Sequence, residues 1–85
     1  MTLQEFDDKW KDYLEPRFYG LAINDTRVID YLDKEFEKEI LINPNFDYAQ
    51  IKLKFGTARV YATSKNESKW EHEINKILKD EKVDK

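Results

Sequence analysis

The chain has 85 residues, a length that corresponds to one small domain. Hydrophobic residues make up 40% and charged residues 39% of it, with both signs of charge mixed and the apolar residues patterned. This balance predicts a folded domain and excludes a disordered chain. The absence of cysteine excludes disulfides, thiolate metal sites and a cysteine nucleophile.

The N-terminal segment MTLQEFDDKW is acidic and amphipathic, which is unlike a secretory signal peptide. No apolar run approaches the roughly 20 residues that a membrane-spanning helix needs. A chain without cysteine also fits a reducing compartment. We therefore expect a cytoplasmic protein that does not interact with a membrane.

The first expected helix runs from Leu3 to about Leu14, with apolar residues at helical spacing. Thr2 and Glu5 form a capping-box pattern at its start, in which each side chain satisfies a free backbone amide. Pro16 ends the helix, because the residue before a proline avoids the α conformation.

The next stretch, residues 16–24, leaves two interpretations open: residues 20–23 form either a short third strand or a buried connection. A second helix is expected from about Thr26 to Ile40, with Asn24 or Asp25 as its N-cap. Its apolar residues recur at helical spacing. They are Val28, Ile29, Leu32, Phe36 and Ile40.

Residues 48–63 change to a period of two, which predicts a β-hairpin. A two-residue loop at Gly56-Thr57 suits a type II′ turn. That turn places residues 55, 53 and 51 opposite 58, 60 and 62, so every pair on one face is apolar. The predicted inner face is Ile51, Leu53, Phe55, Ala58, Val60 and Ala62.

A third helix is expected from near Ser64 to about Lys79, with Ser64 and Glu67 as a second capping box. Its apolar residues are Trp70, Ile74, Ile77 and Leu78. Residues 80–85 are expected to be a frayed tail. The fold class is therefore α+β: residues 1–85 form one domain in the order α-α-β-β-α, an antiparallel hairpin packed by three amphipathic helices. The expected core includes Trp10, Leu32, Phe36, Leu53, Phe55, Trp70 and Ile74.

No residue pattern points to catalysis. The single histidine, His72, has Asn75 and Lys76 at the positions where a helical metal-ligand partner would lie. The chain has no HExxH, Walker or GxSxG motif. Its neighbouring carboxylates are expected on solvated helix faces, where no pocket separates their pKa values. They are the pairs Asp7/Asp8, Asp30/Asp33 and Glu37/Glu39. We expect no enzyme, no small-molecule substrate, no cofactor and no metal.

Charge is unevenly distributed along the chain. Residues 1–47 carry 12 acidic and 6 basic residues, a net charge of −6. Residues 48–65 carry 4 basic residues and no acid, a net charge of +4. Residues 66–85 carry 6 acidic and 5 basic residues, a net charge of −1. An acidic protein thus concentrates positive charge on its hairpin.

The predicted outer face of the hairpin combines these cations with aromatic residues. In the expected register Lys54 lies opposite Arg59, and Tyr61 opposite Lys52, while Tyr48 joins them if the strand begins that early. This face is either simply solvated, or binds a protein through tyrosine and arginine anchors, or binds nucleic acid through phosphates and stacked bases. The acidic half could instead dock a basic partner or imitate DNA.

These patterns favour a small non-enzymatic protein-interaction module that uses the outer face of the hairpin for a protein partner or for self-association. The alternative is a nucleic-acid-binding accessory protein that uses the same face. The small size, the lack of cysteine and the Lys-, Asn- and Glu-rich composition resemble those of small accessory proteins of phages and mobile elements. That resemblance implies a role as an accessory protein but no specific activity.

Overall fold

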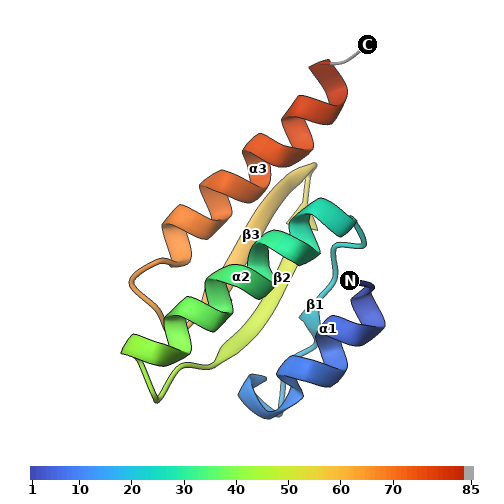
Figure 1. The fold of residues 1–85 in the computed structure, drawn as a ribbon. Helices are drawn as coiled ribbons and strands as arrows, with labels where there is room; N and C mark the ends of the chain where they lie inside the picture. The colour runs from blue at the N-terminus through green and yellow to red at the C-terminus, as the bar shows by residue number, and fades with distance from the viewer. Residues whose placement is uncertain (84–85) are drawn as a thin grey trace.

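The computed structural model of the chain describes the backbone of residues 1–83 and the side chains of residues 1–79. Within these residues the protein is a small α+β domain with three α-helices and a three-stranded mixed sheet (Figure 1). No described helix is long and apolar enough to cross a membrane. The elements in chain order are α1 (Leu3–Trp10), the 3₁₀ turn η1 (Lys11–Tyr13), β1 (Gly20–Leu21), α2 (Thr26–Ile42), β2 (Tyr48–Lys54), β3 (Thr57–Ala62) and α3 (Glu67–Val83).

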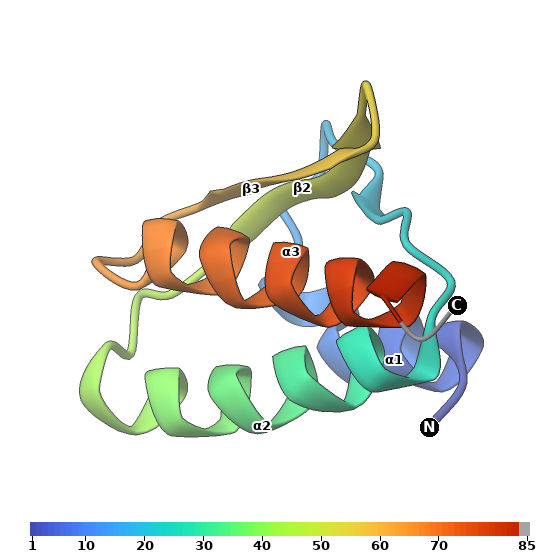
Figure 2. The same ribbon diagram turned by 90° about the horizontal axis from the view of Figure 1, so that it is seen from above.

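The sheet has the strand order β1-β2-β3, with β2 in the centre. The open question about residues 20–23 is answered by a two-residue strand, Gly20–Leu21, that pairs in parallel with β2. Strands β2 and β3 pair antiparallel, as the alternating pattern predicted. Figure 2 shows the helices on one side of β2 and β3, so that one face of the hairpin is covered and the other is open.

The register of the hairpin differs from the predicted one by two residues. The turn is Phe55-Gly56 instead of Gly56-Thr57, and both of its residues have positive φ, 55° and 77°. Leu53 therefore pairs with Ala58, and Lys52 pairs with Arg59. Because side chains alternate with a period of two, this shift keeps the side chains from residue 50 to residue 62 of the paired strands on their predicted faces.

Helix α1 is shorter than predicted. Its capping box is confirmed, because the Thr2 hydroxyl accepts from the Glu5 amide at 3.1 Å and the Glu5 carboxylate accepts from the Thr2 amide at 2.7 Å. The helix ends at Trp10 and tightens into η1, a common ending for α-helices. The chain then turns to the sheet, where Leu14 bridges to Tyr48 and the Glu15 amide donates to the Tyr48 carbonyl.

Helix α2 begins where predicted, with Asp25 as its N-cap, and continues two residues past the predicted end. Two of its carboxylates, Glu35 and Glu39, are buried, with 8% and 4% of their surface exposed. The prediction that Glu39 lies on a solvated face is therefore wrong. Both carboxylates receive hydrogen bonds from α3 or from the turn before it, at Trp70 and Asn66. They tie the two long helices together.

Helix α3 begins at Glu67, three residues later than predicted, and reaches Val83, so residues 80–83 of the predicted tail are helical. The rest of the predicted tail, residues 84–85, lies outside the described residues. The predicted capping box at Ser64 is wrong, because the Glu67 carboxylate accepts from the amide of Ala62 in β3. This contact is the first of three that fasten α3 to the sheet.

The hydrophobic core is an aromatic cluster around Phe36 of α2. Five ring centroids lie within 5.5 Å of the Phe36 ring. They belong to Phe46 (4.8 Å), Tyr48 (5.0 Å), Trp10 (5.3 Å), Trp70 (5.3 Å) and Phe6 (5.5 Å). Leu53 and Phe55 were predicted in this core but are 47% and 95% exposed. The hairpin tip bends away from the helices (Figure 2), so Phe55 is uncovered and Leu53 is only about half covered.

Candidate functional site

The open side of the hairpin is called here the outer sheet face. Alternate residues of β2 and β3 point to it, and their neighbours point to the core: Ile51, Ala58 and Val60 are 0%, 0% and 2% exposed. None of the described helices covers this face (Figure 2). Its residues are Gln50, Lys52, Lys54, Arg59 and Tyr61.

Four of the five predicted site residues share this face. Lys52 lies directly opposite Arg59, and Tyr61 is paired with Gln50 instead of Lys52. The Arg59 guanidinium is 3.9 Å from the Glu71 carboxylate of α3, a distance at which an ion pair on the surface adds little stability. In the part of the chain with described side chains, neither Lys52 nor Lys54 makes an ion pair. The face therefore keeps unneutralised positive charge.

Tyr48, the fifth predicted residue, is not on this face. Its side chain is 1% exposed and lies in the aromatic cluster. A β-bulge between Tyr48 and Gln50 inserts Ala49 as an extra residue, which reverses the alternation at the start of β2. Its buried hydroxyl has no hydrogen-bond partner among the described residues, and burial raises its pKa. Tyr48 therefore belongs to the core.

Phe18 joins the outer sheet face from the loop between η1 and β1. Together with Ala49, Gln50, Lys52 and Tyr61 it lines a shallow groove of about 250 Å³. Phe18 and Tyr61 are 46% and 47% exposed, so each ring is only half covered. The sequence offered no periodic signal for Phe18, because it lies in an irregular loop whose path is set by tertiary contacts.

The outer edge of β3 is closed by side chains of α3. The amides of Ala62, Val60 and Ala58 donate to the side chains of Glu67 (2.8 Å), Glu71 (3.1 Å) and Asn75 (2.8 Å), respectively. The spacings match, since four helical residues rise about 6 Å and two strand residues about 6.7 Å. An incoming strand cannot pair with these amides while the helix holds them, which protects this edge from aggregation.

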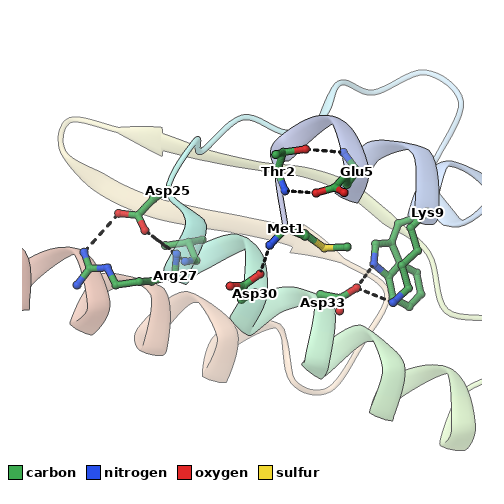
Figure 3. Close-up of polar contacts among 10 residues, drawn as sticks. Met1, Thr2, Glu5, Lys9, Asp25, Arg27, Asp30 and Asp33 are labelled. Atoms are coloured by element: carbon green, nitrogen blue, oxygen red, sulfur yellow. Dashed lines mark hydrogen bonds and ion pairs between the residues drawn. The ribbon is translucent and has the colours of Figure 1, made fainter.

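The acidic half of the protein uses much of its charge internally (Figure 3). The Met1 ammonium group lies 2.7 Å from Asp30. Lys9 bridges Asp33 at 2.8 Å and Glu37 at 3.0 Å, and these hydrogen bonds raise the Lys9 pKa. These contacts join α1 to α2. Because these contacts neutralise part of the acidic charge, the acidic helices are a less clear docking surface than the outer sheet face.

The hairpin tip combines backbone strain with exposure. Phe55 adopts a positive φ of 55° and is 95% exposed, with the Lys54 ammonium 5.9 Å from its ring centroid. Asparagine and glycine are the residues that tolerate this conformation, whereas other L-residues pay about 1–2 kcal/mol. Within the described residues the Phe55 side chain gains almost no burial in return.

Groups suited to catalysis do not converge among the described residues. His72 is exposed, and no group of three or more described His, Asp or Glu side chains could hold a metal ion. A hollow of about 600 Å³ beside Ile42 and Lys65 contains Glu39. That carboxylate already accepts hydrogen bonds from the Asn43 and Asn66 amides at 3.2 and 2.9 Å. The hollow therefore offers a carboxylate that already serves a structural role.

Comparisons of the chain with protein-family models, with curated proteins and with solved structures gave no match. The function proposed for this chain therefore rests on its own surface features. Among the described side chains, the outer sheet face brings half-exposed aromatic rings and unneutralised cations together.

Proposed function

We propose that the protein is a non-enzymatic protein-interaction module that binds a protein partner through the outer sheet face. The observation that carries this proposal is the pairing of Phe18 and Tyr61, each about half exposed, with the unneutralised cations Lys52 and Lys54. Tyrosine and arginine, present here as Tyr61 and Arg59, are enriched among residues that dominate binding energy. A small accessory protein of a phage or mobile element, acting in the cytoplasm, would work through such a surface.

The closed edge of β3 supports binding through the face. Many sheet proteins bind peptides by adding a strand to an exposed edge. Here three α3 side chains occupy the outward-facing amides of β3, and β1 offers only Gly20 and Leu21 at the other side of the sheet. A partner therefore meets side chains of the outer sheet face more readily than backbone groups.

Affinity capture with the tagged protein tests this proposal. We expect the variant Lys52→Glu/Arg59→Glu/Tyr61→Ala to lose partners that the wild type retains. A matched control, Lys65→Glu/Tyr19→Ala, changes an exposed lysine and an 87% exposed tyrosine, neither of which lines the groove, and it should retain them. If the triple variant and the wild type retain the same partners, the outer sheet face is not the binding site.

Nucleic-acid binding is the second candidate, favoured by the row of Lys52, Lys54 and Arg59 beside exposed aromatic rings. The net charge of −3 opposes it, because a long polyanion reaches beyond the outer sheet face and is repelled by the acidic rest of the protein. Titration of labelled single- and double-stranded oligonucleotides at two salt concentrations decides the question. Phosphate contacts weaken steeply with salt, and an absence of binding at low salt rejects this candidate.

A further inference from the structure

The groove on the outer sheet face has the dimensions of a pocket for one side chain. Its volume of about 250 Å³ is smaller than most small-molecule sites, which span roughly 300–1,000 Å³. Phe18 and Tyr61 line it with aromatic rings, and Ala49 keeps it open because its side chain is a single methyl group. An apolar or aromatic side chain of a partner would bury itself against both rings.

Polar groups around the groove specify what must flank that side chain. Lys52 lines it and makes no ion pair or hydrogen bond within the described side chains. Gln50 likewise makes no side-chain hydrogen bond there, so its amide is free to bind a peptide backbone. Lys54 and Arg59 continue the positive charge toward the hairpin tip, and no acid occurs between residues 48 and 65. A partner whose charge is complementary to this positive surface is therefore negatively charged where it binds.

The closed edge of β3 decides how such a segment would lie. Glu67, Glu71 and Asn75 hold the outward amides of that strand, so a peptide cannot extend the sheet there. A segment that lies across the face, with one side chain in the groove, keeps these contacts intact. It also places its neighbouring residues within reach of the lysine side chains of β2.

We propose that the groove between Phe18 and Tyr61 binds an acidic peptide segment that contains one apolar anchor residue, with Lys52 pairing with a carboxylate beside the anchor. This assignment rests on the proposed function and specifies its partner. The anchor supplies apolar burial, and the flanking carboxylates supply charge-assisted contacts to Lys52 and Lys54. Because these cations are exposed, the charge contribution is sensitive to salt.

An NMR titration with a defined peptide tests this proposal. The probe is the capped peptide acetyl-Asp-Glu-Phe-Asp-Glu-amide, added to the ¹⁵N-labelled full chain. We expect saturable shift changes centred on residues 18, 49, 50, 52 and 61. Raising the salt concentration from about 50 to about 500 mM should weaken binding severalfold, as the Debye length shortens.

Variants of the protein and of the peptide separate the two parts of the proposed contact. Tyr61→Ala and Lys52→Glu should each weaken binding about tenfold, which corresponds to the loss of one good anchor or ion contact. Ala49→Leu should block the groove without changing any charge. Tyr19→Ala, at an 87% exposed position outside the groove, should bind as the wild type does. Peptides with alanine for phenylalanine, or with lysines for the acids, should lose binding.

Three outcomes would overturn the assignment: no saturable shift at the groove, equal binding of the basic peptide, or groove shifts with a single-stranded oligonucleotide but not with the acidic peptide. The spectrum of each variant shows whether it is folded, so a folding defect is recognised directly. If the acidic peptide does not bind but the triple variant loses partners in affinity capture, the acidic segment is rejected and the interaction module is retained. Retention of all partners by the triple variant would reject the module itself.

Discussion

The two faces of strands β2 and β3 are made by alternate residues of one hairpin, yet they have opposite roles. On the covered face, Ile51, Ala58 and Val60 are almost fully buried against the helices. On the outer sheet face, Tyr61 is 47% exposed and the lysines of β2 lack ion pairs among the described residues. The domain completes its core without the outer face. Substitutions should therefore separate stability from binding.

Removal of an aromatic ring from the covered side should have the largest effect. Trp70 lies 5.3 Å from the Phe36 ring, and its indole donates to buried Glu35 at 3.1 Å. Trp70→Ala should lower the free energy of unfolding by about 3–5 kcal/mol. Urea denaturation followed by circular dichroism measures this loss. The exposed control Tyr19→Ala should change it by less than about 0.5 kcal/mol, and an equal effect of both would refute the core assignment.

Opening the β3 edge should have the next largest effect. Asn75 accepts from the Ala58 amide at 2.8 Å and also donates to the Ala58 carbonyl at 3.4 Å. Asn75→Ala leaves these backbone groups unpaired at a fully buried residue, a cost of about 1–3 kcal/mol. Light scattering should also detect association, because an unpaired strand edge becomes available.

The neighbouring substitution Lys76→Ala is the matched control for this edge. Lys76 is exposed and pairs only with Glu73 at 3.6 Å within the described residues. Its loss should cost about 0.5 kcal/mol or less and cause no association. If Asn75→Ala behaves like this control, the edge is not held by the α3 side chains.

Acid should loosen the link between α2 and α3. Burial alone would raise the Glu35 pKa, but hydrogen bonds from Trp70 and Lys38 and the charge of Lys69 lower it below the usual value of 4.5. A carboxylate with a lowered pKa stabilises the fold at neutral pH, and this stability is lost as the pH falls through the folded-state pKa.

The free energy of unfolding should therefore decline below about pH 4.5, the usual Glu value. Glu35→Gln should cost about 1–2 kcal/mol at pH 7, since it weakens charge-assisted hydrogen bonds. The free energy of unfolding of this variant should also decline less steeply in the acid range than that of the wild type. Denaturation curves between pH 7 and pH 3 measure both, and identical slopes would contradict the role of Glu35.

The hairpin tip should show the smallest stability effect, and one of opposite sign. Phe55→Asn places a residue that tolerates positive φ in the turn, so the free energy of unfolding should rise by about 1 kcal/mol. Gly56→Ala should lower it, because the φ of 77° strains an alanine even though no atom lies within 4 Å of the added Cβ. Thermal melts of both variants give the comparison. A Phe55→Asn variant less stable than the wild type would show that the exposed ring supports the fold.

Much of this fold could be predicted from local patterns. Helical spacing placed α1, α2 and α3, and alternation assigned the residues of the paired strands to their faces. The register was displaced because the turn uses Phe55 at a positive φ, which sequence rules assign to asparagine or glycine. Tyr48 was misplaced because the bulge at Ala49 reverses the alternation, and a bulge leaves no trace in a short apolar pattern.

The site was harder to predict than the fold. Phe18 reaches the outer sheet face through an irregular loop, where no period links neighbouring residues to one surface. Glu39 was assigned to a solvated helix face because its partners, Asn43 and Asn66, are supplied by the ends of other elements. Contacts of this kind depend on tertiary structure, which local patterns do not contain.

Photocrosslinking at position 61 in the native host cell tests the central claim most directly. A benzophenone amino acid replaces Tyr61 on the outer sheet face or, as a control, Tyr19, which is 87% exposed outside the groove. We expect a discrete protein adduct at position 61, none at position 19, and loss of the adduct when Lys52→Glu is added. An adduct at position 19 but not at position 61 would contradict the assignment of the outer sheet face as the binding surface.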